Sequence, residues 1–150
     1  MSTHHHEGDG TTPIGVYGIS STVYGIAPDP GVHGAYHQLV CGDWWDEDPA
    51  SPQYNTFQHL ACGATPPFGG GSEKLWTTTV AYQHFALVEY NTGPIIAGAG
   101  SAIFIHDDVG GGTNGCVSLA PGNLDTLLTW LQPGQSPHIV IGTASDIRQY

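Results

Sequence analysis

The segment from residue 102 to residue 121 reads Ala102-Ile-Phe-Ile-His106-Asp-Asp-Val-Gly-Gly-Gly-Thr113-Asn-Gly-Cys116-Val-Ser-Leu-Ala-Pro121. Residues 101–106 form an apolar run that predicts a strand ending in a histidine. A glycine-rich loop follows, and the chain returns to Cys116 just before a predicted helix. Nine residues separate His106 from Cys116, which is enough for a loop that brings the two side chains face to face. The segment therefore predicts a strand–loop–helix unit that presents a histidine to a cysteine.

A histidine beside a cysteine is a pattern typical of acyl transfer. A free thiol has a pKa of about 8.5 and is a weak nucleophile at neutral pH, so a neighbouring base is the usual means of activating it. We therefore take Cys116 as the candidate nucleophile and His106 as its base. Gly115 lets the backbone pass close to a substrate, and the amides of residues 114–116 would point at a developing oxyanion. On spacing alone, a buried structural cysteine and a core histidine explain the same pattern.

The rest of the chain predicts a mainly β single domain over residues 1–150. Glycine and proline are abundant, which favours many turns and short strands. Leucines at 124, 127, 128 and 131 follow helical spacing, with Pro121 tolerated in the first turn and Pro133 ending the helix. Residues 27–72 read mostly as loop. The other elements expected are strands at 12–19, 81–90 and 137–142 and one or two helical turns at 72–76.

The cysteines bear on the compartment of the protein. Cys41 and Cys62 bracket a stretch rich in proline, glycine and aromatic residues. A bond between them would close a loop of about twenty residues and stabilise the fold by about 3 kcal/mol in the chain-entropy account. The loop lacks the periodicity to hold itself together, which favours the bond and leaves Cys116 as the odd thiol. The alternative is three reduced, buried cysteines in a cytosolic fold.

The charge balance excludes several classes of partner. Lys74 and Arg148 are the two basic residues, against thirteen acidic ones, and the formal net charge is -11. We expect no nucleic-acid partner, because the chain cannot neutralise a row of phosphates. Membrane association is not indicated, since the apolar runs are too short to span a bilayer. The first residues resemble no signal peptide, so the chain is either cytoplasmic or a mature or shortened form.

Three other groups of residues have simple structural explanations. The four tryptophans more often fill a core than line a binding cleft. The acidic run at 43–48 lacks the spacing of a calcium loop and reads as a solvated loop face. The histidines at 4–6 read as a flexible run, natural or left from a tag, and not as a closed coordination shell. We therefore expect no metal site and no cofactor.

Two motifs resemble the L,D-transpeptidase catalytic domain family, also called the YkuD-like family. Its signature runs from a histidine through a variable loop to Ser/Thr-His-Gly-Cys and an apolar residue, matched here by His106 and Thr113-Asn-Gly-Cys-Val117. Residues Glu7-Gly-Asp-Gly-Thr-Thr-Pro-Ile-Gly-Val-Tyr17 resemble the family pattern (E)GDG-x-TP-x-G-x-(F/Y). Residues 44–55 are similar to secreted actinobacterial members. Together the matches cover most of residues 7–142.

The resemblance implies an L,D-transpeptidase-like β-sandwich with one amphipathic helix and a long disulfide-stapled loop. Cys116 would attack a peptidoglycan stem tetrapeptide between the L-centre of meso-diaminopimelate and the terminal D-alanine. His106 would take the thiol proton and pass it to the leaving D-alanine. The backbone carbonyl of Asp107 would orient the imidazole. The residues expected to position the substrate and its oxyanion are Thr113, Asn114 and Gly115.

The resemblance also implies the partner and the location. The acyl group would pass to an amine of a neighbouring stem, forming a 3→3 crosslink, or to water, as in an L,D-carboxypeptidase. The protein would be secreted or associated with the cell wall, with stem peptides as its partners. The sequence leaves the oligomeric state open.

The chain departs from the family pattern in several places. Asn114 stands where members usually have histidine, and Ser118 where arginine or asparagine is common. The loop between His106 and Cys116 is shorter than in many members, and the strands that usually precede residue 7 are expected to be missing. These departures keep open a second hypothesis, a non-catalytic module that binds the cell wall or a partner on the same scaffold.

Overall fold

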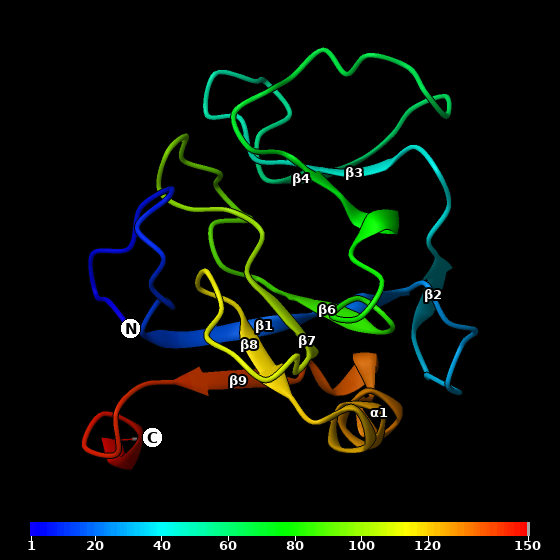
Figure 1. Ribbon diagram of the computed structural model, residues 1–150. Helices are drawn as coiled ribbons and strands as arrows, with labels where there is room; N and C mark the ends of the chain where they lie inside the picture. The colour runs from blue at the N-terminus through cyan, green and yellow to red at the C-terminus, as the bar shows by residue number, and fades with distance from the viewer. Residues whose placement is uncertain (150) are drawn as a thin grey trace.

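The large sheet is built around one long strand, β1 (Gly15–Gly25), in a computed structural model that describes residues 1–149. The first residues of β1 pair with β9 in antiparallel register, and its last residues pair with β2 in parallel register. Figure 1 shows β1 crossing the molecule beside β6 and β9. The other strands of this six-stranded sheet are β2 (Ala35–Gln38), β6 (Phe85–Val88), β7 (Phe104–Asp107), β8 (Val117–Leu119) and β9 (His138–Ile141), with the order β2-β1-β6-β7-β8 and β9 on β1.

A second, smaller sheet lies above the first in the view of Figure 1. It has the strand order β4-β3-β5, formed by β3 (Asp43–Asp46), β4 (Thr56–His59) and β5 (Glu73–Lys74). A short 3-10 helix, η1 (Leu75–Thr77), follows β5. A disulfide joins Cys41 to Cys62 and closes the loop that contains β3 and β4, so the predicted pairing is confirmed.

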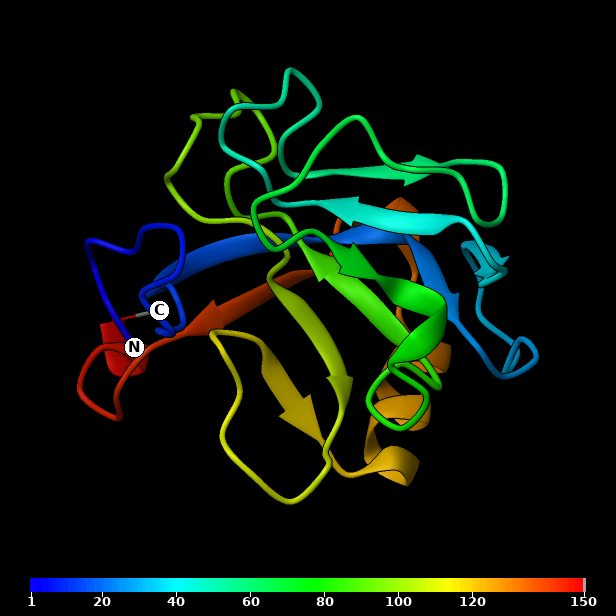
Figure 2. The same ribbon diagram turned by 45° about the horizontal axis from the view of Figure 1, so that its top comes forward.

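The molecule has three layers, with the large sheet in the middle. Side chains on one face of this sheet pack against helix α1 (Pro121–Trp130). Side chains on the other face, Phe85 and Phe104 among them, pack against Trp45 and Leu75 of the small sheet and the turn after it. Figure 2 shows the helix and the small sheet on opposite sides. Because successive residues of a strand point to opposite faces, β7 sends Ile105 toward the helix and Phe104 toward the small sheet.

The amphipathic helix begins at Pro121 as expected and ends at Trp130, one residue before its predicted end. Leu124 and Leu128 are completely buried, and Leu131 caps the helix with a backbone N–H to the Leu127 carbonyl. The mainly β fold with one helix and a disulfide-stapled loop is confirmed. Two further 3-10 turns, η2 (Pro133–Gln135) and η3 (Ile147–Gln149), flank β9.

The predicted strands are present with different ends. The run at 12–19 is a strand only from residue 15 and continues to residue 25, because its later residues pair with β2 and β6. The strands expected at 81–90, 101–106 and 137–142 are β6, β7 and β9, each four residues long. The turns expected at 72–76 are β5 followed by η1. The expectation that 27–72 is mostly loop missed β2, β3 and β4, which are too short to show a periodicity.

The prediction of a solvated face for the acidic run at 43–48 is wrong for its two aspartates in β3. Asp43 and Asp46 are both completely buried. His37 and His59 lie 2.8 and 2.6 Å from the two oxygens of Asp43. The oxygens of Asp46 accept hydrogen bonds from nearby backbone and serine groups. Burial of a carboxylate is tolerated when such partners replace water, and here they come from His37, from His59 and from residues just after Asp46.

The tryptophans divide between core and surface. Trp44 and Trp45 are buried, as expected for core residues, whereas Trp130 is 70% exposed at the end of the helix. The core explanation is therefore wrong for Trp130, which lies on the side of α1 turned away from the sheet. Within residues 1–149, the structure has no helix that is long and apolar enough to cross a membrane.

Candidate functional site

Parallel pairing of β7 with β8 brings the candidate base and nucleophile to one face of the large sheet. The register places Ile105 opposite Val117 and His106 opposite Ser118. One step back along this register, Cys116 lies beside Phe104, and the Phe104 N–H donates to the Cys116 sulfur at 3.4 Å. His106 is two residues beyond Phe104, so its side chain points to the same face. The spacing of these residues along their strands thus places both side chains on the face of the large sheet that packs against the small sheet.

The Cys116 thiol is held by the backbone that leads into β7. Its sulfur donates a hydrogen bond to the Ala102 carbonyl oxygen at 3.2 Å. Burial raises the pKa of the thiol to about 12, and the charges of Glu73 and Glu47 act in the same direction against the opposing effect of the Phe104 N–H. The resting group at neutral pH is therefore a protonated thiol, and its reaction as a nucleophile requires a base.

His106 is buried and has a fixed tautomer. Its Nδ1 lies 2.8 Å from the backbone carbonyl oxygen of Asp107. Since a carbonyl oxygen only accepts hydrogen bonds, Nδ1 carries the proton and Nε2 keeps a lone pair. The ring packs edge-on against Tyr82, 5.9 Å between centroids, on the side of the sheet that Cys116 also faces. Among residues 1–149 the thiol bonds to Ala102 and not to this imidazole, and the catalytic roles of His106, Asp107 and Cys116 stay predictions.

The loop residues before Cys116 have different positions. The Thr113 hydroxyl donates to the Cys116 carbonyl oxygen at 2.7 Å and holds the loop. Gly115 has a φ of +114°, and a Cβ there would lie 2.5 Å from the Thr11 carbonyl oxygen, so this turn requires glycine. Asn114 lines a cavity beside the thiol. Of the three residues expected to position a substrate, Asn114 is the one whose side chain can reach it there.

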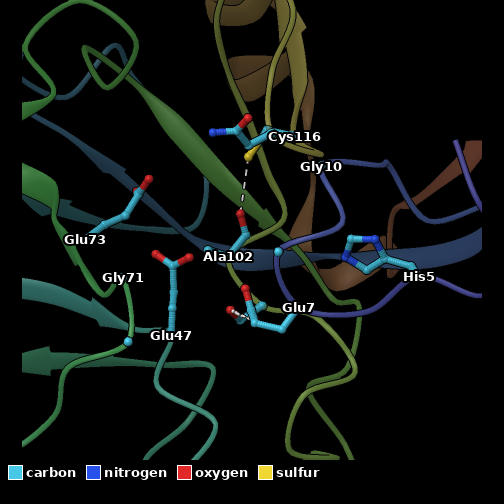
Figure 3. A pocket seen from close by; sticks show the side chains of 12 residues that line it. His5, Glu7, Gly10, Glu47, Gly71, Glu73, Ala102 and Cys116 are labelled. Carbon is cyan, nitrogen blue, oxygen red and sulfur yellow. Dashed lines mark hydrogen bonds between the residues drawn. The ribbon is translucent and has the colours of Figure 1, made fainter.

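This cavity has a volume of about 400 Å³ and lies where the small sheet, the N-terminal loop and the start of β7 meet. Cys116 and Ala102 form one wall. Figure 3 shows Glu47 and Glu73 on one side of them, and His5 and Glu7 on the other. The described lining residues include three glutamates and no lysine or arginine. The cavity therefore favours a ligand group that is neutral or positively charged.

The glutamates in this cavity are in unusual states. Burial, reinforced by the charges of Glu73, Glu7 and Asp46, raises the pKa of Glu47 to about 9, and its Oε1 is buried without a hydrogen-bond partner in the described part of the chain. Burial likewise raises the pKa of Glu73, which accepts a hydrogen bond from the Tyr82 hydroxyl. Glu47 is consequently a neutral carboxylic acid at neutral pH and would ionise when a cation approaches.

Cys116 also borders a second cavity, which none of the three glutamates lines. This cavity of about 320 Å³ is lined largely by apolar residues of β8 and β9, including Val117, Ile139 and Ile141. Cys116 thus borders both an acidic cavity and an apolar one.

Asn55, which sequence reasoning missed, fixes the backbone that holds the thiol. Its Oδ1 accepts hydrogen bonds from the Trp45 indole at 3.0 Å and from the Ala102 N–H at 3.1 Å. Its Nδ2 donates to the backbone carbonyl oxygens of Tyr90 and Asn91. Ala102 has a φ of +53°, an uncommon conformation for alanine that these contacts maintain. No local pattern in the sequence links residue 55 to residue 102, because the link exists only across the two sheets.

His5 is the second residue that the sequence did not reveal. The run at 4–6 was expected to be flexible, but the His5 side chain is only 5% exposed and lines the cavity of Cys116. Its ring packs edge-on against Tyr90, 5.2 Å between centroids. The expectation of a flexible run is thus wrong at His5, while the neighbouring His6 is 68% exposed. The Gly-Asp-Gly turn that follows was the available signal, since Asp9 binds both histidines.

The candidate site is built from His, Cys and Glu side chains, which are also common metal ligands. Within residues 1–149, no group of three or more His, Cys, Asp or Glu side chains is placed to hold a metal ion. The chemistry that this arrangement supports is that of a thiol, an imidazole and carboxyl groups.

Comparison with known proteins gives one match. The family model described as YkuD, L,D-transpeptidase catalytic domain, matches residues 4–141 of the chain, from the N-terminal histidines to the end of β9. No curated protein and no solved structure matches the chain. The match spans both sheets, the helix and every residue of the candidate site. It does not separate secreted actinobacterial members from others, so that subtype stays a prediction.

Proposed function

Since the chain belongs to the YkuD family of L,D-transpeptidase catalytic domains, we propose that it transfers the acyl group of a peptidoglycan stem peptide through a thioester on Cys116. The observation that carries the proposal is the position of this thiol. It lies in the wall of a cavity of about 400 Å³, on the sheet face to which His106 points. The substrate is a stem tetrapeptide, cut between the L-centre of meso-diaminopimelate and the terminal D-alanine.

His106 is the base of the first step. Its Nε2 lone pair takes the thiol proton, and the sulfur attacks the carbonyl carbon of the scissile bond. The proton then passes to the nitrogen of the leaving D-alanine as the C–N bond breaks. The bond from His106 to the Asp107 carbonyl holds the imidazole in the tautomer that this transfer needs. Because burial raises the pKa of Cys116 to about 12, the thiol is protonated at rest, and its attack requires the transfer of this proton to His106.

The two cavities suit a reaction with two substrates. The acidic cavity, with Glu47 and Glu73 in its wall, suits an acceptor that approaches as an ammonium ion. The apolar cavity beside β8 and β9 is then left for the donor stem. An amine acceptor gives a 3→3 crosslink, and water in its place gives a carboxypeptidase reaction.

A location outside the cytoplasm is part of this proposal. The Cys41–Cys62 disulfide supports it, because such bonds form and persist in oxidising compartments. Peptidoglycan stems are also found only outside the cytoplasmic membrane once they are assembled into the wall. We therefore propose that the protein acts as a secreted or wall-associated enzyme.

One observation favours the alternative, a non-catalytic module that binds the wall. The thiol hydrogen points to the Ala102 carbonyl oxygen and not to the imidazole. Catalysis then requires the side chain of Cys116 to rotate toward His106 when substrate binds. Hydrogen bonds of catalytic groups often tighten only in the complex with substrate, so this resting contact is consistent with either function.

Intact-protein mass spectrometry with a disaccharide-tetrapeptide separates these functions. The enzyme is expected to gain the mass of the acyl group that remains after loss of D-alanine, with the adduct on Cys116. Cys116→Ala, the matched control with its fold checked by near-UV circular dichroism, should gain no mass. A product dimer indicates an amine acceptor, and free tripeptide indicates water. An unmodified wild-type protein that still binds peptidoglycan would establish the non-catalytic module instead.

A further inference from the structure

The imidazole of His5 packs directly against the backbone at Gly100. A Cβ placed on Gly100 would lie 2.4 Å from both Cδ2 and Nε2 of His5, so the ring rests where a side chain at position 100 would be. Gly100 has a φ of +102°, a conformation that also favours glycine. Gly100 is followed by Ser101 and Ala102, and the Ala102 carbonyl oxygen contacts the thiol. His5 is therefore fixed against the same short segment that holds Cys116.

Asp9 sets the tautomer of this imidazole. The His5 Nδ1 lies 2.9 Å from Asp9 Oδ1 and 3.1 Å from the Thr11 hydroxyl. Asp9 is kept ionised, because hydrogen bonds from Thr11 and His6 outweigh desolvation and hold its pKa well below the usual range. A carboxylate only accepts hydrogen bonds, so Nδ1 of His5 is the donor and Nε2 keeps the lone pair. Within residues 1–149 this Nε2 has no hydrogen-bond partner.

Two of the three glutamates of the cavity already accept hydrogen bonds from hydroxyl groups, and the third is protonated. Glu7 accepts hydrogen bonds from the Tyr54 and Ser101 hydroxyls. Glu73 accepts one from Tyr82, and Glu47 is a neutral acid at neutral pH. His5 is the one histidine among the described lining residues. Within the described residues its Nε2 has no hydrogen-bond partner, and an imidazole nitrogen with a free lone pair is the commonest general base in enzymes.

We propose that His5, oriented by Asp9, is a second base of this site and activates the nucleophile that attacks the thioester on Cys116. This inference rests on the proposed function, because it needs an acyl-enzyme. His106 acts on the thiol from within the interlayer core, whereas His5 acts from the cavity through which the second nucleophile enters. The two half-reactions thus use different histidines as the base that removes the proton of the nucleophile.

The step balances without any further reactant. An acceptor that enters as an ammonium ion first releases one proton to water in the cavity. The free amine, or a water molecule, then attacks the thioester carbonyl carbon and gives a proton to Nε2 of His5, which becomes an imidazolium paired with Asp9. The C–S bond breaks, and the sulfur leaves with the electron pair. A proton from solvent returns to the sulfur through Nε2 of His106, while His5 releases its proton to water in the cavity. The enzyme ends the cycle with one thiol and two neutral imidazoles.

The test measures the two half-reactions separately in the full chain. A tetrapeptide donor is mixed with enzyme in a single turnover, release of D-alanine reports acylation, and intact mass reports decay of the acyl-enzyme with and without an amine acceptor. His5→Gln is expected to leave acylation within about 3-fold of wild type and to slow decay by about 100-fold or more, the usual contribution of a general base. His6→Gln is the matched control, since His6 contacts the same aspartate but is exposed.

Three results would overturn the inference. Decay of the acyl-enzyme at the wild-type rate in His5→Gln would show that His5 is no base. An equal loss of acylation and decay would show that His5 only supports the fold. Asp9→Asn keeps the His5 imidazole but no longer fixes its tautomer. This variant should slow decay of the acyl-enzyme without slowing acylation, and it can be measured even if His5→Gln is unstable. A wild-type decay rate in Asp9→Asn also contradicts the inference. If wild type forms no acyl-enzyme at all, the proposed function itself fails, which is a distinct outcome.

Discussion

Alkylation of the native protein by iodoacetamide tests whether Cys116 rests as a thiol. Cys41 and Cys62 are joined in the disulfide, so Cys116 is the one thiol available, all three cysteines lying within the described residues. Burial raises the pKa of this thiol from 9.0 to about 12. At pH 8 a rise of three pKa units lowers the thiolate fraction by about 1000-fold, while the more basic thiolate is about 16- to 32-fold more nucleophilic. The net expectation is alkylation about 30- to 60-fold slower than that of an ordinary cysteine.

The pH dependence of this reaction gives the sharper measurement. The rate should rise tenfold for each pH unit from pH 7 to pH 10 without reaching a plateau, since the thiolate fraction stays small throughout. Glu73→Gln keeps the hydrogen bond from Tyr82 but removes a charge that raises the thiol pKa, so it should speed alkylation at pH 8. Glu89→Gln, an exposed carboxyl beside Gly18, is the control and should change nothing. A plateau below pH 8 would refute the reasoning, because it would reveal a thiolate already formed at rest.

Three further variants test the stability of the site. The pKa of Glu47 is raised in the folded protein, so its contribution to stability is complete below about pH 4.5 and is lost as the pH rises through about 9. Glu47→Gln should therefore raise the Tm at pH 8 and leave it unchanged at pH 4. An equal shift of the Tm at both pH values would contradict this expectation. Asn55→Ala removes four buried hydrogen bonds and should lower the free energy of unfolding in urea by about 2–4 kcal/mol, against less than about 0.5 kcal/mol for the exposed Asn123→Ala. Replacing Cys41 and Cys62 together by alanine should cost about 3 kcal/mol in the same assay, since the closed loop spans 21 residues, and a loss below about 1 kcal/mol would exclude a major constraint on the unfolded chain.

Features with a local cause could be read from the sequence. The helix at 121–130 follows from leucines at helical spacing and a proline in its first turn. β7 follows from a short apolar run, and its histidine lies inside the strand, one residue before the end. The disulfide is predicted from two cysteines that bracket a stretch without helical or strand periodicity. Each of these depends on residues that are close in the chain, and composition and spacing are sufficient to find them.

Features with a tertiary cause could not be read in this way. Asp43 and Asp46 look like solvated residues in the sequence, and only the histidines and serines that fold over them make their burial tolerable. The packing of His5 requires Gly100, a glycine 95 residues further along the chain, and no sequence periodicity connects the two positions. The orienting contacts of a thiol site are of this second kind, because a reactive group must be held from several directions at once.

The small sheet therefore belongs to the proposed catalytic apparatus as well as to the core. Asn55 lies inside the loop that the disulfide closes, and its Oδ1 fixes the Ala102 N–H. The carbonyl of Ala102 in turn orients the thiol of Cys116. A displacement of the loop would move this carbonyl relative to Cys116, which directly precedes β8, and would change the rotamer from which Cys116 must turn toward His106. The Cys41–Cys62 disulfide thus influences the position of the Cys116 thiol, although the two are far apart in the sequence. The influence passes through the hydrogen bond from Ala102 to Asn55, the strained backbone of Ala102 and the hydrogen bond from the thiol to the Ala102 carbonyl.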